Sequence, residues 1–215
     1  MRILLLGTTG YHPNERRHTA CMMLPEAGVV LDAGTAMFRV RDHLATSTLD
    51  IFLTHSHLDH VIGLTYLLDI LFQKLTERVC VHGEEAKLQA IRQHLFAKDL
   101  FPVVPQVQWQ PLQGSVTLRD GGVVSYFPVA HPGGAIGYRI DWKDRSLAYV
   151  TDTTAAPSAP YVASIRGVDL LLHECYFPDG WDDRAQLHDP RRPGRAGRSG
   201  RSTRVGPHQP AAKRG

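Results

Sequence analysis

The most informative part of this sequence is the run Thr54-His55-Ser56-His57-Leu58-Asp59-His60. Four of its side chains, three imidazoles and one carboxylate, are of the types that bind zinc and similar divalent metals. Side chains two positions apart project to the same side of an extended backbone, so His55 and His57 are predicted to face one way. Four such residues within six positions are denser than chance packing produces, and the run therefore predicts a metal site.

Three more ligand-type residues stand just after predicted strands elsewhere in the chain: His131, Asp152 and Asp32. The strand ends of an α/β sheet commonly meet at one edge. Each of the three residues, taken alone, would be read as an ordinary loop or cap residue. Taken together with the run over 54–60, they predict one constellation of metal-binding side chains.

The body of the chain alternates short apolar runs with segments of helical periodicity, and then continues as a succession of strands. Strands are predicted over residues 2–6, 28–31, 50–54, 79–82, 106–110, 115–118, 123–129, 135–141, 146–151 and 168–173, and helices over 61–75, 84–96 and 156–165. This order implies an α/β fold in which helices cover the sheets.

The run over 54–60 resembles the signature of the metallo-β-lactamase superfamily, and the resemblance extends over roughly residues 1–187. It implies an α/β fold of the αββα sandwich type. Further details are similar to the branch that contains ribonuclease Z and cyclic phosphodiesterases. These details are Leu6-Gly7-Thr8, Arg17-His18-Thr19, Gly63-Leu64 and Leu172-His173-Glu174.

The resemblance implies two divalent metal ions, with Zn²⁺ as the expected metal and Mn²⁺ as the alternative. The implied ligands are His55, His57 and His131 for the first ion, Asp59 and His60 for the second, and Asp152 between both. A pair of such ions can hold a hydroxide that attacks an ester bond.

Other residues have supporting roles by the same resemblance. Asp32 would orient the histidine run through hydrogen bonds. Asp59 would also accept the proton of the attacking water. His173 and Glu174 match a His-Glu pair near the active site of ribonuclease Z relatives, and the alternative is that they are only the polar end of a buried strand.

The expected substrate is a phosphodiester. Ribonuclease Z relatives commonly carry a tRNA-gripping arm between the positions matched by His131 and Asp152. Here that interval is only 21 residues and is filled by two predicted strands. This favours a small or cyclic phosphodiester over an RNA 3′ end, which stays as a second substrate class. The alternative activity is hydrolysis of thioesters or lactones by the same metal chemistry.

The composition changes sharply near Leu187, after which the chain is rich in Arg, Gly and Pro. Such a segment buries too little apolar surface to offset its ordering entropy, so we predict a hydrolase domain over 1–187 and a disordered basic tail over 188–215. One possible set of codons for Leu187-His188-Asp189-Pro190 reads Ser-Thr-Thr-Pro when it is shifted by one base. This motivates the hypothesis of a frameshift near Leu187. Sequencing the gene tests it: an in-frame continuation without His-Ser-Thr text removes the hypothesis.

The resemblance also implies a late metal histidine and a His-Ser-Thr motif, and the sequence offers neither. The surroundings of His188 and His208 are typical of solvated tail residues. We therefore expect the sandwich to lack its last helix and strand, and the second metal site to lack a ligand. The alternative to an enzyme is a catalytically weak metal-binding or interaction module.

Charge and cysteine content set the remaining expectations. The net charge is +3, but residues 189–215 carry +7, so the rest of the chain carries −4 and the basic balance says little about nucleic-acid binding. Three cysteines without a CxxC motif favour a reduced, cytoplasmic setting. No apolar run reaches membrane length, so no membrane partner is expected. Analogy with the resembled branch predicts a homodimer.

Overall fold

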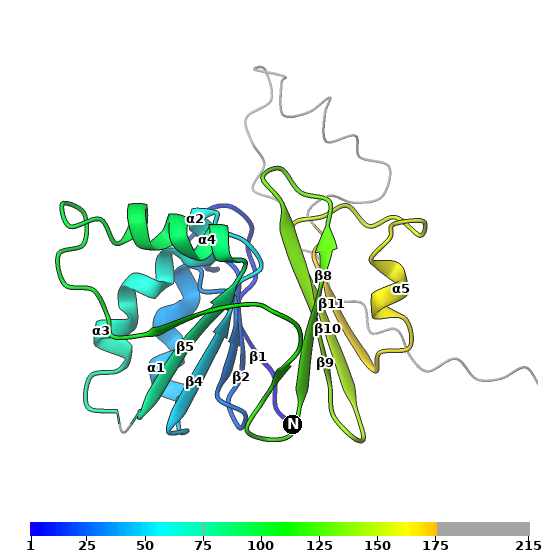
Figure 1. Cartoon of the computed structure of the whole chain (residues 1–215), viewed down its shortest axis with the longest axis horizontal. Helices are drawn as coiled ribbons and strands as arrows, with labels where there is room; N and C mark the ends of the chain where they lie inside the picture. The colour runs from blue at the N-terminus through cyan, green and yellow to red at the C-terminus, as the bar shows by residue number, and fades with distance from the viewer. Residues whose placement is uncertain (75, 176–215) are drawn as a thin grey trace, which may run out of the picture.

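The computed structural model of the chain describes residues 1–74 and 76–175, and these form two sheets that face each other (Figure 1). The first sheet has six strands in the order in which they follow along the chain. They are β1 (Leu4–Gly7), β2 (Cys21–Leu24), β3 (Val29–Leu31), β4 (Thr48–Phe52), β5 (Arg78–Gly83) and β6 (Gln108–Pro111). β1 to β3 pair antiparallel, whereas β3 to β6 run parallel. The ends of β3, β4 and β5 therefore lie at one edge.

The second sheet has five strands in the order β11-β10-β9-β8-β7. Their bounds are β7 (Val116–Thr117), β8 (Val123–Val129), β9 (Ala135–Asp141), β10 (Ser146–Val150) and β11 (Leu170–His173). β7 to β10 pair antiparallel, and β11 is parallel to β10. The ends of β8 and β10 lie at the same end of this sheet, since both are antiparallel to β9.

Helices cover the outer faces of both sheets, so the predicted αββα sandwich is confirmed (Figure 1). In Figure 1, α1, α3 and α4 cover the first sheet and α5 covers the second. The helical segments are η1 (Thr35–Arg39), α1 (Val40–His43), α2 (Leu58–Val61), η2 (Ile62–Tyr66), α3 (Leu67–Ile70), α4 (Glu85–Ala90), η3 (Ile91–Leu95) and α5 (Val162–Ile165).

Alternation along β4 shows how the first sheet separates two apolar cores. Leu49 and Ile51 are fully buried against the helices. Phe52 points to the other side, where it joins Tyr138 and Ile140 of β9 between the sheets. Successive side chains of a strand point to opposite faces, and each large apolar side chain buried in this way contributes about 1.5–3 kcal/mol. These cores fix the position of the loop that follows β4.

The predicted secondary structure was wrong in three places. β2 was not predicted. The helix predicted over 61–75 is three short segments, because Gly63 packs directly against the Gly34 carbonyl and Gln73 adopts a φ of 59° beyond the end of α3. The helix predicted over 156–165 is only α5, since Pro157 and Pro160 lack the N–H that a helix interior needs.

Some predictions concern residues outside the described ranges. These are the domain boundary at 187, the tail over 188–215, the loss of a last helix and strand, and the roles of His188 and His208. Within 1–74 and 76–175, no helix has the length and apolar character needed to cross a membrane.

Candidate metal centre

The histidine run leaves β4 as extended chain and then turns into α2. His57 precedes the helix with φ −67° and ψ 148°, and α2 begins at Leu58. The N–H of His60 donates to the carbonyl of His57 at 3.0 Å, which closes the turn. The extended part presents His55 and His57, and the helical part presents Asp59 and His60. The change from strand to helix periodicity thus brings all four side chains to one end of the first sheet.

The first group of ligand-type side chains consists of His55, His57 and His131. Their ligand atoms all lie within 4.8 Å of one another, and Nε2 of His131 is 3.1 Å from Nδ1 of His57. His131 follows β8, in a loop in which Gly133 and Gly134 have φ near 80° and the Lys87 side chain donates to the Gly133 carbonyl. The loop therefore holds His131 against the histidine run.

His55 also belongs to a second group, with His60 and Asp152, whose ligand atoms lie within 4.8 Å of one another. Nε2 of His60 lies 2.9 Å from Oδ2 of Asp152 and 3.4 Å from Oδ2 of Asp59. Asp152 follows β10 with a left-handed φ of 53°. The two groups thus share an imidazole and are adjacent.

A buried carboxylate organises the imidazoles. Asp32 is fully buried, and its Oδ1 accepts the N–H of Thr54 at 2.8 Å. Its Oδ2 lies 2.9 Å from Nδ1 of His60, so that nitrogen carries a proton and Nε2 faces the second group. The Thr54 hydroxyl donates to Asp32 and lies 3.0 Å from Nδ1 of His55. His55 then donates through Nδ1 and keeps a lone pair on Nε2.

The Nε2 atom of His55 is the strongest sign that the site fits a cation. It is buried and has no hydrogen-bond partner. A buried polar atom without a partner is costly unless a metal ion, an ordered water or a ligand satisfies it. It lies in both groups, where the other donors are imidazoles and carboxylates, the ligands that suit zinc.

Electrostatics in the second group also favour a cation. Burial opposes the protonation of His60, but the nearby carboxylates, Asp32 first, raise its pKa well above the usual value. Burial alone would raise the pKa of Asp152, yet the hydrogen bond and charge of His60 lower it to about 2. Burial and the charge of His60 lower the pKa of His55 to about 4, so its imidazole is neutral at pH 7.

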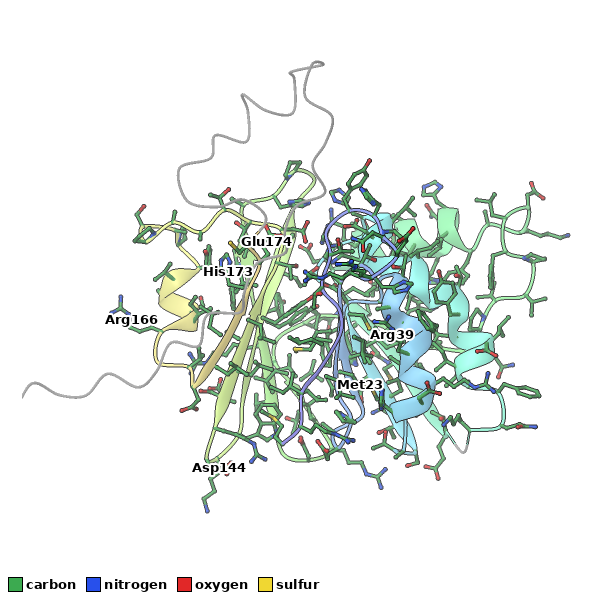
Figure 2. The ribbon with its side chains drawn as sticks, turned by 180° about the vertical axis from the view of Figure 1, so that it is seen from behind. Met23, Arg39, Asp144, Arg166, His173 and Glu174 are labelled. Carbon is green, nitrogen blue, oxygen red and sulfur yellow. The ribbon has the colours of Figure 1, made fainter. Side chains whose placement is uncertain are left out.

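His173 ends β11 and Glu174 follows it (Figure 2). Both line the same cleft as His60 and Asp152. Nε2 of His173 is 2.8 Å from the Tyr161 hydroxyl, and its Nδ1 is 2.7 Å from the carbonyl of Glu174. The carboxylate of Glu174 accepts the N–H of Thr153 at 2.7 Å. Burial, followed by the charge of Asp152, raises the pKa of Glu174 to about 7. Both ring nitrogens of His173 are therefore occupied, and Glu174 holds the residue after Asp152.

A cleft of about 380 Å³ opens next to the second group. His60, Asp152, His173 and Glu174 line it together with Arg17 and Tyr149. This volume lies in the range of small-molecule sites. A ligand in this cleft would contact the second group directly.

The residues predicted from the sequence thus come together. Five of the six predicted ligands form the two groups, and Asp59 lies at their rim. Sequence reasoning missed Thr54 and Tyr149, both of which contact Asp32. Thr54 immediately precedes the histidine run and could have been considered for that reason. No local pattern marks Tyr149.

A third cluster that the sequence did not suggest lies between the sheets. Asp50, Cys80 and His82 place ligand-type atoms within 4.8 Å of one another, and all three are buried. Arg78 donates two hydrogen bonds to the Asp50 carboxylate, at 2.8 and 3.1 Å, and His82 lies 2.9 Å from it. The guanidinium also donates to the Cys80 sulfur. A cationic side chain already neutralises this carboxylate.

Comparison with known proteins agrees with this geometry. A family model described as β-lactamase superfamily domain matches residues 28–196. Ribonuclease Z of Acaryochloris marina is 31% identical, over 84% of this chain and 60% of the relative. Ribonuclease Z of Haloarcula marismortui is 28% identical, over 81% of this chain and 59% of the relative. The chain thus spans about 60% of the length of these relatives.

A solved structure adds a second kind of relative. It is the structure of a diphosphatase from the PhnP family. That protein is 25% identical and superposes with a TM-score of 0.60, over 79% of this chain and 71% of the diphosphatase chain.

Proposed function

The chain belongs to the β-lactamase superfamily, and on that premise we propose that it is a metal-dependent hydrolase of phosphodiester bonds. One observation carries the proposal: two adjacent groups of imidazoles and carboxylates share His55, whose buried Nε2 lacks a partner. Within the superfamily, the similarity to two ribonucleases Z and to a diphosphatase supports a phosphate ester as the substrate.

The residues that would hold the metals are assigned from the two groups together with the family resemblance. His55, His57 and His131 would bind one divalent ion, Zn²⁺ or alternatively Mn²⁺. His60 and Asp59 would bind a second, and Asp152 would contact both. When bound, such ions lower the pKa of water and stabilise negative charge on phosphate oxygens.

The protein's own side chains would perform the remaining steps. Asp59 lies at the rim of the second group with 13% of its side chain exposed, so it can accept the proton of the attacking water. Asp32 holds His60 in the orientation that faces the site. Glu174 fixes the backbone of Thr153 and thereby the turn that presents Asp152. His173 contacts Tyr161 and the Glu174 carbonyl, which supports a role in holding β11. The catalytic role that the resemblance implies for His173 and Glu174 stays a prediction.

The connection between His131 and Asp152 supports a small substrate. That interval consists of β9, β10 and the turn between Asp141 and Ser146, with no inserted arm. The cleft of about 380 Å³ suits a small or cyclic phosphodiester. An RNA 3′ end remains the second candidate, because the two named relatives are ribonucleases Z.

The test is hydrolysis of a model diester, a 2′,3′-cyclic nucleotide and a short RNA. We expect turnover of the first two to stop with a chelator and to return with Zn²⁺ or Mn²⁺. His57→Ala should lower it by more than about 100-fold, since it removes a ligand rather than an outer partner. The control is His94→Ala, which changes an exposed histidine outside the site. Full activity of His57→Ala contradicts the proposal. A wild-type chain that binds one metal ion or none and hydrolyses no diester favours a metal-binding module.

A further inference from the structure

The Tyr149 side chain joins the two sheets at the metal centre. Tyr149 lies on β10 of the second sheet and is 7% exposed. Its ring packs in the core between the sheets, and its hydroxyl donates to Oδ2 of Asp32 at 3.1 Å. Asp32 belongs to the first sheet's side, directly after β3. One side chain therefore connects the second sheet to the carboxylate that orients His60.

We propose that Tyr149 is a positioning residue of the metal centre, which acts through Asp32 on His60. The proposal deepens the proposed function, because it concerns the second metal group of the same site. Asp32 is fully buried and has a left-handed φ of 57°, a conformation that needs support from its surroundings. The donors to its carboxylate are Thr54, His60 and Tyr149. Of these, Tyr149 alone comes from the second sheet.

The geometry of β10 shows why this contact matters. Asp152, three residues after Tyr149, lies 2.9 Å from Nε2 of His60. Tyr149 reaches the other nitrogen, Nδ1, through the Asp32 carboxylate. The end of β10 thus fixes His60 from both sides of its ring. A shift of β10 against the first sheet would move both contacts together, so the tyrosine couples the packing of the sheets to the second metal group.

The chain contains a matched control. Tyr138 on β9 pairs directly with Tyr149, is fully buried in the same core, and donates its hydroxyl to the Leu53 carbonyl at 2.6 Å. Its hydroxyl thus donates to a backbone carbonyl, whereas the Tyr149 hydroxyl donates to Asp32. Tyr138→Phe and Tyr149→Phe each remove one buried hydroxyl and leave the ring in place. Their effects on folding should be similar, whereas their effects on the metal centre should differ.

The experiment measures Zn²⁺ binding to the full chain by competition with a chromophoric chelator, without substrate. Tyr149→Phe should weaken the binding of one ion per chain by about tenfold, the lower end of the range for outer partners of a ligand, and Tyr138→Phe should leave both ions unchanged. Equal binding in Tyr149→Phe and the wild type, or an equal loss in Tyr138→Phe, overturns the proposal. If the wild type binds Zn²⁺ but hydrolyses no phosphodiester, the proposed substrate fails and this inference does not.

A second measurement uses the wild-type protein and so does not depend on the folding of a variant. In the wild-type protein, nuclear magnetic resonance should detect a slowly exchanging Tyr149 hydroxyl proton with a cross-peak to the Nδ1 proton of His60. Both protons point to the same carboxylate oxygen. A hydroxyl that exchanges as fast as that of the exposed Tyr11 overturns the proposal.

Discussion

Two regions of this protein collect imidazole and carboxylate groups within 4.8 Å, and they differ in what neutralises the carboxylates. At Asp50, the guanidinium of Arg78 and the imidazole of His82 both donate to one carboxylate. Around His60, the carboxylates pair only with imidazole among the described residues. Donor type and spacing are therefore similar, but a guanidinium neutralises the carboxylate in one cluster, whereas the carboxylates of the other pair with an imidazole. We infer that the metals bind at the cluster without a guanidinium.

Removal of the shared imidazole should break the metal centre most severely. His55→Ala deletes the imidazole that both groups share and that would bind the first ion, so we expect loss of bound Zn²⁺ and a fall in diester hydrolysis of more than about 100-fold. Elemental analysis and the diester assay provide the measurements. The corresponding change in the other cluster, His82→Ala, should leave the number of bound ions unchanged. Retention of two bound ions by His55→Ala would contradict the assignment of His55 as a metal ligand.

Neutralising a carboxylate in each cluster sharpens the contrast. Asp32→Asn places an amide against Nδ1 of His60 and removes the charge that holds it, so Zn²⁺ affinity should fall about 10–100-fold. Asp50→Asn should change Zn²⁺ affinity by less than about twofold, because the Asp50 carboxylate orients none of the proposed metal ligands. Chelator competition on both variants gives the comparison. A similar loss in both would mean that the two clusters are not distinct.

Asp50→Asn should lower the stability of the fold although it leaves Zn²⁺ affinity nearly unchanged. Asp50→Asn leaves Arg78 and His82 without their charged partner, and we expect the free energy of unfolding to fall by about 1–3 kcal/mol. Urea unfolding of the metal-free variant and wild type measures the difference. Asp50→Asn as stable as the wild type would contradict the view of this cluster as a structural ion pair.

Acid should reduce that stability difference. Burial would raise the pKa of Asp50, but the hydrogen bonds from His82 and Arg78 outweigh it and lower the pKa below its usual value. A lowered folded pKa means that the carboxylate stabilises the fold fully above the unfolded value, about pH 4, and loses this effect as the pH falls through the folded pKa. The difference between wild type and Asp50→Asn should therefore shrink below about pH 4. A difference that grows on acidification would refute this explanation.

The histidine run could be recognised from the sequence because its ligand-type side chains are close together in the chain. His55 and His57 alternate on extended chain, and Asp59 and His60 follow in one helical turn, so local geometry determines where they point. His131 and Asp152 could be added because strand ends meet at one edge of a sandwich. The α/β class followed from the alternation of predicted strands and helices, and the αββα sandwich followed from the family resemblance.

The other cluster and the tyrosine depend on pairing between distant segments. Cys80 and His82 share a face of β5, which the sequence does suggest, but their contact with Asp50 requires the register that pairs Asp50 with Cys80. The contact of Tyr149 with Asp32 requires the packing of one sheet on the other. Neither register nor sheet packing can be derived from local periodicity. The broken helix after His60 has a similar cause, since Gly63 packs closely on another loop.

The most direct test of the distinction between the clusters is anomalous diffraction at the zinc edge, from crystals of the full chain grown with Zn²⁺. We predict peaks between His55, His57 and His131 and between His60, Asp59 and Asp152, and no peak beside Asp50, Cys80 and His82. A peak at the Asp50 cluster would contradict the account. So would the lack of any peak at the two histidine groups.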